Sequence, residues 1–303
     1  MKVSLNLWVI VAGITLYFGL VLGVILFLRW RRKTRWPFKL EDKLLRGPGE
    51  ALKQKIVELD ERVSLEFFGG ITGGFLVFAI VGESVAKFFS LSPLAATSLA
   101  IGGLAVVFGV SGWRIAQAWK ERQNCFLGWF GERFVAEWLE SSKVEGWRIF
   151  HDVPCANNGA SFNIDHVAVG VNGVFVIETK TRRKGKARPG REDNKVIFDG
   201  LELDWPWGKD AFGLQQAEDN ALWLADWIKS EVNELVQVTP LLALPAWWID
   251  DSIAKRSLQK RLCRPVNPKW LPGILGRDQP VLTQKQVDLI ATRLEVRCRD
   301  VTD

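Results

Sequence analysis

The sequence predicts an α-helical membrane region followed by an α/β domain. The 303 residues are 48% hydrophobic with a mean hydropathy of +0.06, which is high for a water-soluble protein and low for a pure transporter. Long apolar runs fill much of the first 113 residues, whereas β-branched runs and amphipathic helical patterns follow them. We therefore divide the chain into a transmembrane region at 1–113 and a cytosolic domain at 114–303.

Apolar runs in the N-terminal region predict about three membrane spans: roughly residues 5–28, 66–84 and 94–112. The first run is long enough for a hydrocarbon core of roughly 30 Å at about 1.5 Å per residue. The basic cluster at 29–35 that follows it is expected to stay in the cytoplasm. Residues 29–65 are then a cytoplasmic connector with a short helix at 50–63, and the C-terminal domain lies on the cytoplasmic side of the inner cell membrane.

Glycines in the second span predict close helix packing. Gly69, Gly70, Gly73 and Gly74 form two overlaid small-xxx-small pairs, a spacing that lets helices approach closely. The contact is expected within the helical hairpin or between the protomers of a homo-oligomer. The lipid bilayer is the other expected partner of this region.

Histidine and cysteine usage limits the kinds of metal site in this chain. The two histidines, His151 and His166, are too few for a multi-histidine centre, and the four cysteines have no C-x-x-C spacing. Carboxylates are therefore the expected metal ligands. The net charge of +6 favours anionic partners such as nucleic acid or acidic lipid without identifying one.

The cytosolic domain begins with an amphipathic helix predicted at 125–142 and a strand at 147–153. Glu132 lies at the edge of the apolar stripe of this helix, where a carboxylate needs a cation or a hydrogen-bond donor. A salt bridge at the start of the helix, or a favourable interaction with the helix dipole, is an equally open interpretation of Glu132.

A β-hairpin is predicted from two β-branched runs, at 162–171 and 174–181. They flank Asn172-Gly173, which is the strongest short sequence signal for a two-residue type I′ turn. Such a turn pairs Val171 with Val174 and thereby sets the register of the hairpin.

In this register, Val167 faces Glu178 and Asp165 faces Lys180, so that Asp165, Glu178 and Lys180 project from one face of the sheet. Two carboxylates desolvated together need a cation, and Mg²⁺ with oxygen ligands meets that need. Such an ion lowers the pKa of a bound water, and a lysine orients that water or stabilises the transition state. The alternative is structural: an Asp–Lys cross-strand pair beside a glutamate at the strand end.

Three segments together resemble a known family: Gly131-Glu132-Arg133, Asn163–Val167 and Gly173–Lys180. They resemble the nuclease-related domain, NERD, a branch of the PD-(D/E)xK nuclease superfamily. The resemblance covers about residues 124–235. It implies a restriction-endonuclease-like mixed β-sheet flanked by helices, with an aspartate at the end of one strand and Glu-x-Lys on the next.

The resemblance also implies roles for individual residues. Asp165 and Glu178 would bind Mg²⁺, or Mn²⁺, with Glu132 as a further metal ligand. Lys180 would position the attacking water, and Gln216 would orient the site.

The glutamine assignment departs from the family pattern. Family members commonly carry Asn-Pro-x-x-Gln before a helix, whereas this chain has Ala211–Gln216 without Asn-Pro, ahead of a predicted helix at 217–229. Gln215 is therefore the alternative to Gln216.

A basic loop and several tryptophans are candidate contacts to nucleic acid. Lysine and arginine supply most sequence-independent affinity for phosphates, and the expected contacts are Arg182, Arg183, Lys184, Lys186 and Arg188. A solvated loop is the alternative. Trp205-Pro206-Trp207 and Trp247-Trp248 either stack on bases or pack inside the domain.

These inferences predict a membrane-anchored, divalent-metal-dependent nuclease that hydrolyses DNA phosphodiester bonds, with RNA as the alternative substrate. The alternative function is a non-catalytic, membrane-anchored module that binds nucleic acid or protein through a nuclease-like fold.

Overall fold

The computed structural model describes residue 13 and residues 16–17, 19–28, 30–31, 43–157 and 159–301. The chain divides into two compact units. The helical unit comprises 55–124 with the described part of 1–40, and the α/β unit comprises 41–54 with 125–303. Of the predicted first span, 5–28, residues 19–28 form a short apolar helix, whereas residues 5–12 and most of the basic cluster at 29–35 lie outside the described residues.

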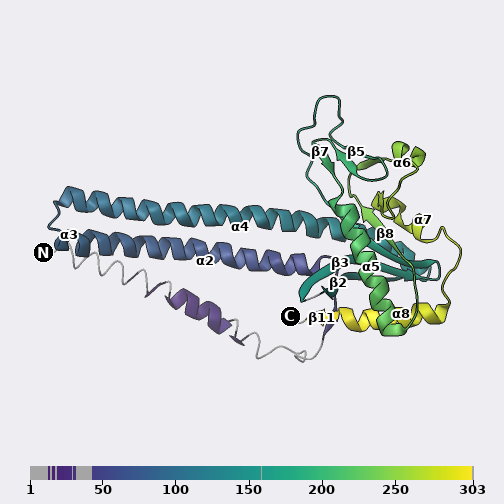
Figure 1. Cartoon of the computed structure of the whole chain (residues 1–303). Coiled ribbons are helices and arrows are strands. Elements are labelled where there is room, and N and C mark those ends of the chain that lie inside the picture. The colour runs from purple at the N-terminus through teal and green to yellow at the C-terminus, as the bar shows by residue number, and fades with distance from the viewer. Residues whose placement is uncertain are drawn as a thin grey trace. The chain divides into compact units, whose positions relative to one another are not determined.

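Two long helices dominate the helical unit: α2 (Glu50–Ile80) and α4 (Pro93–Val144). They run side by side (Figure 1), joined by a π-helix, η1 (Val81–Val85), and by α3 (Ala86–Phe88). Arg122 Nε donates to Asp60 Oδ1 at 2.5 Å between them. The predicted connector helix and second span are thus one helix, because no proline interrupts Glu50–Ile80.

Only two helices in the described part of the chain are long and apolar enough to cross a membrane, Glu50–Ser84 and Pro93–Val144. The sequence predicted about three spans, so the described residues correct this number to two candidates. Length and composition alone define these candidates. The apolar side chains of both are mostly exposed, unlike those of a helix in a protein core.

Two of the four predicted glycines make the close helix contact. A Cβ atom at Gly70 would lie 2.6 Å from Ser111 Oγ, and one at Gly74 would lie 2.6 Å from Phe108. No such neighbour lies within 4 Å of Gly69. Gly70 and Gly74 therefore pack α2 against α4 within one chain.

The α/β unit is built on a mixed five-stranded sheet of order β10-β8-β4-β3-β2. Its strands are β2 (Arg148–Asn157), β3 (Ala160–Gly170), β4 (Gly173–Thr179), β8 (Val238–Ala243) and β10 (Arg264–Val266). The strands β2, β3 and β4 pair antiparallel, whereas β4, β8 and β10 pair parallel. This arrangement confirms the predicted mixed sheet flanked by helices.

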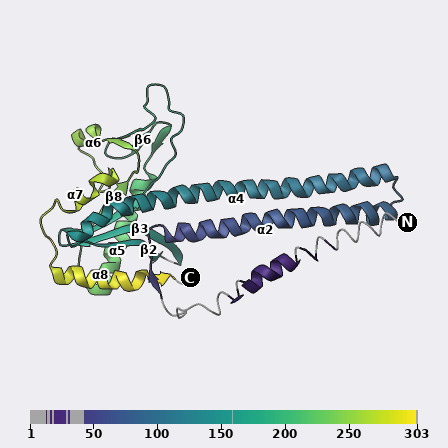
Figure 2. The same cartoon turned by 180° about the vertical axis from the view of Figure 1, so that it is seen from behind.

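Helices cover both faces of this sheet. On one face, the valines of β3 and β4 pack against α5 (Phe212–Val232) and α8 (Gln284–Cys298) (Figure 2). On the other face, Phe175 and Ile177 pack against the end of α4 and against α7 (Leu271–Leu275). The sheet therefore lies between two buried hydrophobic cores.

Short elements that the sequence analysis did not predict complete the unit. A second sheet has the order β7-β6-β5-β9, formed by β5 (Lys195–Phe198), β6 (Leu203–Trp205), β7 (Gly208–Asp210) and β9 (Trp248–Asp250). A two-stranded sheet pairs β1 (Leu44–Leu45) with β11 (Arg299–Val301). The remaining elements are α6 (Ser252–Arg256) and a 3₁₀ helix, η2 (Pro268–Trp270).

The predicted hairpin register is wrong by two residues. Val169, not Val171, pairs with Val174, and Val167 pairs with Val176 instead of Glu178. The loop residues are Val171 and Asn172. Since the side-chain period of a strand is two, a shift of two keeps every side chain on its predicted face.

A tertiary contact explains the shifted turn. The carbonyl oxygen of Val171 accepts hydrogen bonds from the N–H groups of Val281 at 2.8 Å and Leu282 at 2.9 Å. The Asn172 side chain donates to the carbonyl oxygen of Asp278. The loop before α8 thus binds the hairpin end, and these contacts override the local preference of Asn-Gly.

Candidate functional site

The ends of β3 and β4 bring Asp165 and Glu178 together. Asp165 precedes His166, which pairs with Ile177, so Asp165 lies opposite Glu178 and not opposite Lys180 as predicted. The N–H of Thr179 donates to Asp165 Oδ2 at 2.7 Å. Burial of the carboxylate, and then the charges of Glu178 and Glu132, raise the pKa of Asp165 well above its usual value.

Glu178 is nearly inaccessible, with 1% of its surface exposed. Lys180 Nζ donates to its Oε1 at 2.8 Å, and Asn220 Nδ2 donates to its Oε2 at 3.0 Å. Burial raises the pKa of Glu178, against the opposing effects of Lys180 and Asn220. The Asp165, Glu178 and Lys180 side chains therefore form one group, although Lys180 pairs with Glu178.

Glu132 reaches this group from α4. It is 7% exposed, and its Oε2 is a buried oxygen without a hydrogen-bond partner. Burial, followed by the charges of Asp152 and Glu178, raises the pKa of Glu132 to about 8, while Lys180 and the N–H of Gly49 act against this. Glu132, Asp165 and Glu178 thus repel one another electrostatically.

Helix α5 contributes Asn220, which sequence reasoning missed. Gly213 also lies on this face, since a Cβ atom there would be 3.0 Å from Lys180 Cγ. Gln216 lies between Gly213 and Asn220 at helical spacing, and its side chain makes no hydrogen bond with the described residues. Gln215 is instead exposed and bonded to Asp219 and Arg261. The assignment of Gln216 as the site glutamine stays a prediction.

The segment at 43–51 packs beside Glu132, which the sequence did not indicate. Arg46 Nη1 donates to Asp152 Oδ2 at 2.6 Å, and the N–H of Ala51 donates to the same oxygen at 2.9 Å. Asp152 is buried and adopts a left-handed backbone conformation with φ of 48°. This segment therefore holds Asp152 in place, and the negative charge of Asp152 contributes to the raised pKa of Glu132.

The basic loop after β4 divides into paired and unpaired cations. Arg182 binds Asp210 at 2.8 Å, and Arg188 binds Asp204 at 2.5 Å. Arg183, Lys184 and Lys186 are exposed and make no ion pair with the residues the structure describes. The structure thus leaves three of the five predicted phosphate-binding side chains available.

The tryptophans named above occupy different environments. Trp205 and Trp247 are buried and contact each other edge to face, with ring centroids 5.0 Å apart. Trp207 stacks on Trp205. Trp248 is 67% exposed. Core packing therefore accounts for Trp205, Trp207 and Trp247 but not for Trp248.

His151 and His166 form a buried pair across β2 and β3, with 2.8 Å between their Nδ1 atoms. Burial lowers the pKa of His151 to about 4 and lowers that of His166 well below its usual value. Neither histidine touches the carboxylate group in any described hydrogen bond. The pair is a structural feature of the sheet.

The histidine pair predicts acid sensitivity. A histidine whose pKa is lowered on folding contributes stability that is fully present above about pH 6.5, the pKa of the unfolded state. This stability is lost as the pH falls toward about 4, the pKa of His151 in the folded state. For His151 this amounts to roughly 3 kcal/mol, at about 1.4 kcal/mol per pKa unit. Urea unfolding at pH 7.5 and pH 4.5 should therefore show a smaller acid loss for His151→Gln than for the wild type. Equal losses in the two proteins would contradict the assignment.

The carboxylate group is suited to a divalent ion in its donor chemistry. Glu132 Oε2 is an unpartnered buried oxygen, and burial, followed by the charges of neighbouring carboxylates, raises the pKa values of Glu132 and Asp165. Among the described residues, however, no three His, Cys, Asp or Glu side chains are arranged to hold a metal ion. Lys180 and Asn220 bond both oxygens of Glu178, so coordination by Glu178 requires them to give way.

Comparison with known proteins identifies the segment that carries this group. No curated protein and no solved structure matches the chain. Residues 127–245 match the model of the family NERD, the nuclease-related domain, which agrees with the resemblance predicted over about 124–235. The stretch from 127 to 245, with Glu132, Asp165, Glu178 and Lys180, is thus a nuclease-related domain and suggests a nuclease-like function.

Proposed function

We propose that this protein is a membrane-anchored nuclease that uses Mg²⁺, or Mn²⁺, to hydrolyse DNA phosphodiester bonds, with RNA as the alternative substrate. One observation carries the proposal: three carboxylates converge around Lys180 within a nuclease-related domain. Keeping such carboxylates together without a cation is costly.

Asp165, Glu178 and Glu132 would hold the metal ion after side-chain movements that bring the three carboxylates together and free Glu178 from Lys180 and Asn220, because the described arrangement does not hold one. When bound, a divalent ion there supplies a water of lowered pKa and neutralises charge on the phosphoryl group. Lys180 already donates to Glu178 Oε1, and it would orient the attacking water or stabilise the developing negative charge. Gln216, on the face of α5 that carries Asn220, would orient the site.

The helical unit would anchor the enzyme in the inner cell membrane. Both long helices expose most of the apolar side chains in their apolar stretches, and the bilayer would cover these side chains. The basic cluster at 29–35 favours a cytoplasmic position for the C-terminal domain. Gly69, which has no neighbour within 4 Å of a Cβ atom, remains available for contact between protomers, whereas a Cβ atom at Gly73 would lie 4.0 Å from Val107 of α4.

The test uses the full chain in washed membranes and in detergent. Wild-type protein should cleave plasmid DNA with Mg²⁺ and not with EDTA, and the activity should stay with the membrane pellet after carbonate extraction. Glu178→Gln should lower the cleavage rate by at least about 10²-fold. Glu231→Gln, at an exposed position of α5, is the matched control and should cleave normally.

Absence of cleavage by folded wild-type protein, or normal cleavage by Glu178→Gln, would overturn the nuclease proposal in favour of a non-catalytic binding module. Release of the protein into the carbonate supernatant would overturn the anchoring proposal.

A further inference from the structure

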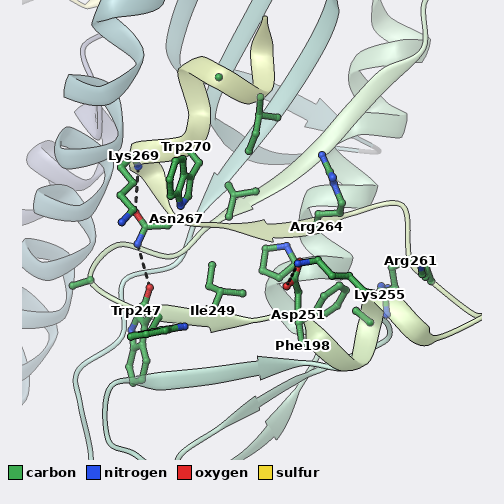
Figure 3. Close-up of a pocket in the computed structure, with 18 of the residues that line it drawn as sticks. Phe198, Trp247, Ile249, Asp251, Lys255, Arg261, Arg264, Asn267, Lys269 and Trp270 are labelled. Carbon is green, nitrogen blue, oxygen red and sulfur yellow. Dashed lines mark hydrogen bonds and ion pairs between the residues drawn. The ribbon is translucent and has the colours of Figure 1, made fainter. Parts of the chain in front are cut away.

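A large cavity opens in the α/β unit at the carboxyl ends of β8 and β10. Its volume is about 1300 Å³, above the roughly 300–1,000 Å³ of typical small-molecule pockets. Residues of β9, α6, β10 and η2, among them Ile249, Lys255, Arg264 and Lys269, line it (Figure 3). Lys184, from the loop after β4, also lines it. The cavity thus has room for more than one nucleotide-sized group.

The cavity and the carboxylate group share one edge of the sheet. Thr179 of β4 pairs with Ala243 of β8, which pairs with Val266 of β10. Neighbouring strands lie about 4.8 Å apart, so β4 and β10 are separated by roughly 10 Å. Glu178 and Lys180 flank Thr179, whereas the cavity-lining residues Ala246 and Asn267 follow β8 and β10.

The cavity lining is strongly basic. Seven of its residues are lysine or arginine, and Asp251 is the single acidic one. Asp251 is already paired with Lys255 at 2.8 Å. Among the described residues, five of the lining cations have no ion-pair partner: Lys184, Lys260, Arg264, Lys269 and Arg277. Lys269 lies over the ring of Trp270, 5.0 Å from its centroid. Unpaired cations in a cavity attract a polyanion, as phosphate groups do.

Two exposed tryptophans accompany these cations. Trp248 is 67% exposed and Trp270 is 63% exposed, although both line the cavity. Asn267 fixes the wall between them, since its Nδ2 donates to the Trp247 carbonyl oxygen at 3.2 Å and its Oδ1 accepts from the N–H of Lys269 at 3.2 Å (Figure 3). Exposed indole faces beside unpaired cations suit unstacked bases, which a duplex does not present.

We propose that this cavity binds a single-stranded stretch of nucleic acid beside the proposed cleavage site, with its phosphates on Lys184, Lys260, Arg264 and Arg277 and its bases on Trp248 and Trp270. The inference rests on the proposed function and narrows its substrate to single strands or to duplexes with single-stranded ends. Lys184 belongs both to the basic loop after β4 and to the lining of this cavity.

The test measures binding apart from cleavage. Full-length Asp165→Asn protein in detergent with EDTA is titrated against fluorescent single-stranded DNA, single-stranded RNA and duplex DNA of about twelve units, within the usual footprint of such grooves. Trp248→Ala and Trp270→Ala should each weaken single-strand binding by about tenfold. They should change duplex affinity by less than about twofold. Trp138→Ala, exposed on α4, is the matched control and should bind normally.

A second pair of variants tests the cations. Arg264→Ser and Arg277→Ser should each weaken single-strand binding and reduce the slope of affinity against salt by about one. Arg293→Ser, exposed on α8, should leave both unchanged. The DNA and RNA arms identify which single strand the cavity prefers.

Unchanged single-strand affinity in both tryptophan variants, or an equal loss for duplex, would overturn the inference. If wild-type protein never cleaves but the tryptophan variants lose single-strand binding, the cavity proposal stands and the nuclease proposal fails. If the wild type cleaves and the variants bind as it does, only the cavity proposal fails.

Discussion

Replacing Asp165 with Asn is expected to abolish Mg²⁺-dependent DNA cleavage and, in the metal-free protein, to raise the melting temperature. Removing one charge-stabilising group from an active site typically costs about 10²–10³-fold in rate, and loss of a metal ligand should cost at least as much. The stability gain has a separate cause, which is the burial of the Asp165 carboxylate and, after it, the repulsion by Glu178 and Glu132.

The sign of the stability change follows from the direction of the pKa shift. A carboxyl whose pKa is raised on folding contributes stability that is fully present below its unfolded pKa, near 3.8, and is lost as the pH rises through its folded pKa. At pH 8, far above the unfolded pKa, Asp165 therefore destabilises the fold. The Asp165→Asn substitution removes this buried titratable group and keeps a side-chain oxygen that can accept from the N–H of Thr179.

The measurement is thermal unfolding at pH 8 in EDTA, beside a cleavage assay in Mg²⁺. For a unit of this size, each kcal/mol relieved should raise the melting temperature by about 2–4 °C. Asp226→Asn, exposed on α5, is the control and should change neither quantity. A lower melting temperature for Asp165→Asn would show that Asp165 is instead a structural ion-pair partner.

Millimolar Mg²⁺ is expected to raise the melting temperature of the wild type at pH 8, and Glu132→Gln should remove most of this rise. An ion present at 100 times its dissociation constant stabilises the folded state by about 2.7 kcal/mol, which corresponds to roughly 5–10 °C. Glu132 matters because its buried Oε2 is an oxygen that no donor satisfies.

The Mg²⁺ response should also depend on pH. The pKa of Glu132 is raised from 4.5 to about 8, so its contribution to metal-free stability is complete below about 4.5 and is lost as the pH rises through about 8. Binding of the ion requires the ionised carboxylate, and the rise in melting temperature should therefore grow between pH 6 and pH 9. Glu231→Gln, which removes one negative charge at an exposed position of α5, is the control and should leave the Mg²⁺ response unchanged. A response independent of both pH and Glu132 would place the ion elsewhere.

The sequence was sufficient for the parts of the site that lie on one hairpin. Because side chains alternate along a strand, Asp165 and Glu178 were assigned to a common face even though the register was two residues wrong. The error arose from the loop before α8, whose N–H groups bind the Val171 carbonyl oxygen. Such a contact, more than 100 residues away in the chain, has no local sequence signal.

Long-range partners account for what sequence reasoning missed. Asn220 reaches Glu178 across 42 residues, and Arg46 reaches Asp152 across 106. Each of these side chains is of a type that is common on a solvated helix or loop. The packing of α5 on the sheet places Asn220 beside Glu178, and the pairing of β1 with β11 places Arg46 near Asp152.

The basic cavity was likewise not predicted, because its residues come from distant parts of the chain. Its cations are spread between Lys184 and Arg277, and its tryptophans lie in short elements without a periodic pattern. The sequence did raise Trp247-Trp248 as a candidate stacking pair, but not which of the two is exposed. Trp247 is buried and Trp248 is exposed, because Trp247 packs in a cluster with Trp205 and Trp207.

The contacts of residues 43–51 have a topological consequence for the α/β unit. Residues 41–54 and 125–303 form one unit, with 55–124 between them in the chain, so residues 55–124 are an insertion in a discontinuous unit. The two edges of the insertion are neighbours, since a Cβ atom at Gly128 would lie 2.9 Å from Leu52 Cδ1. A fragment that starts after the last apolar run would therefore lack Arg46 and Gly49, whereas a chain that joins 54 to 125 through a short linker would keep the unit whole.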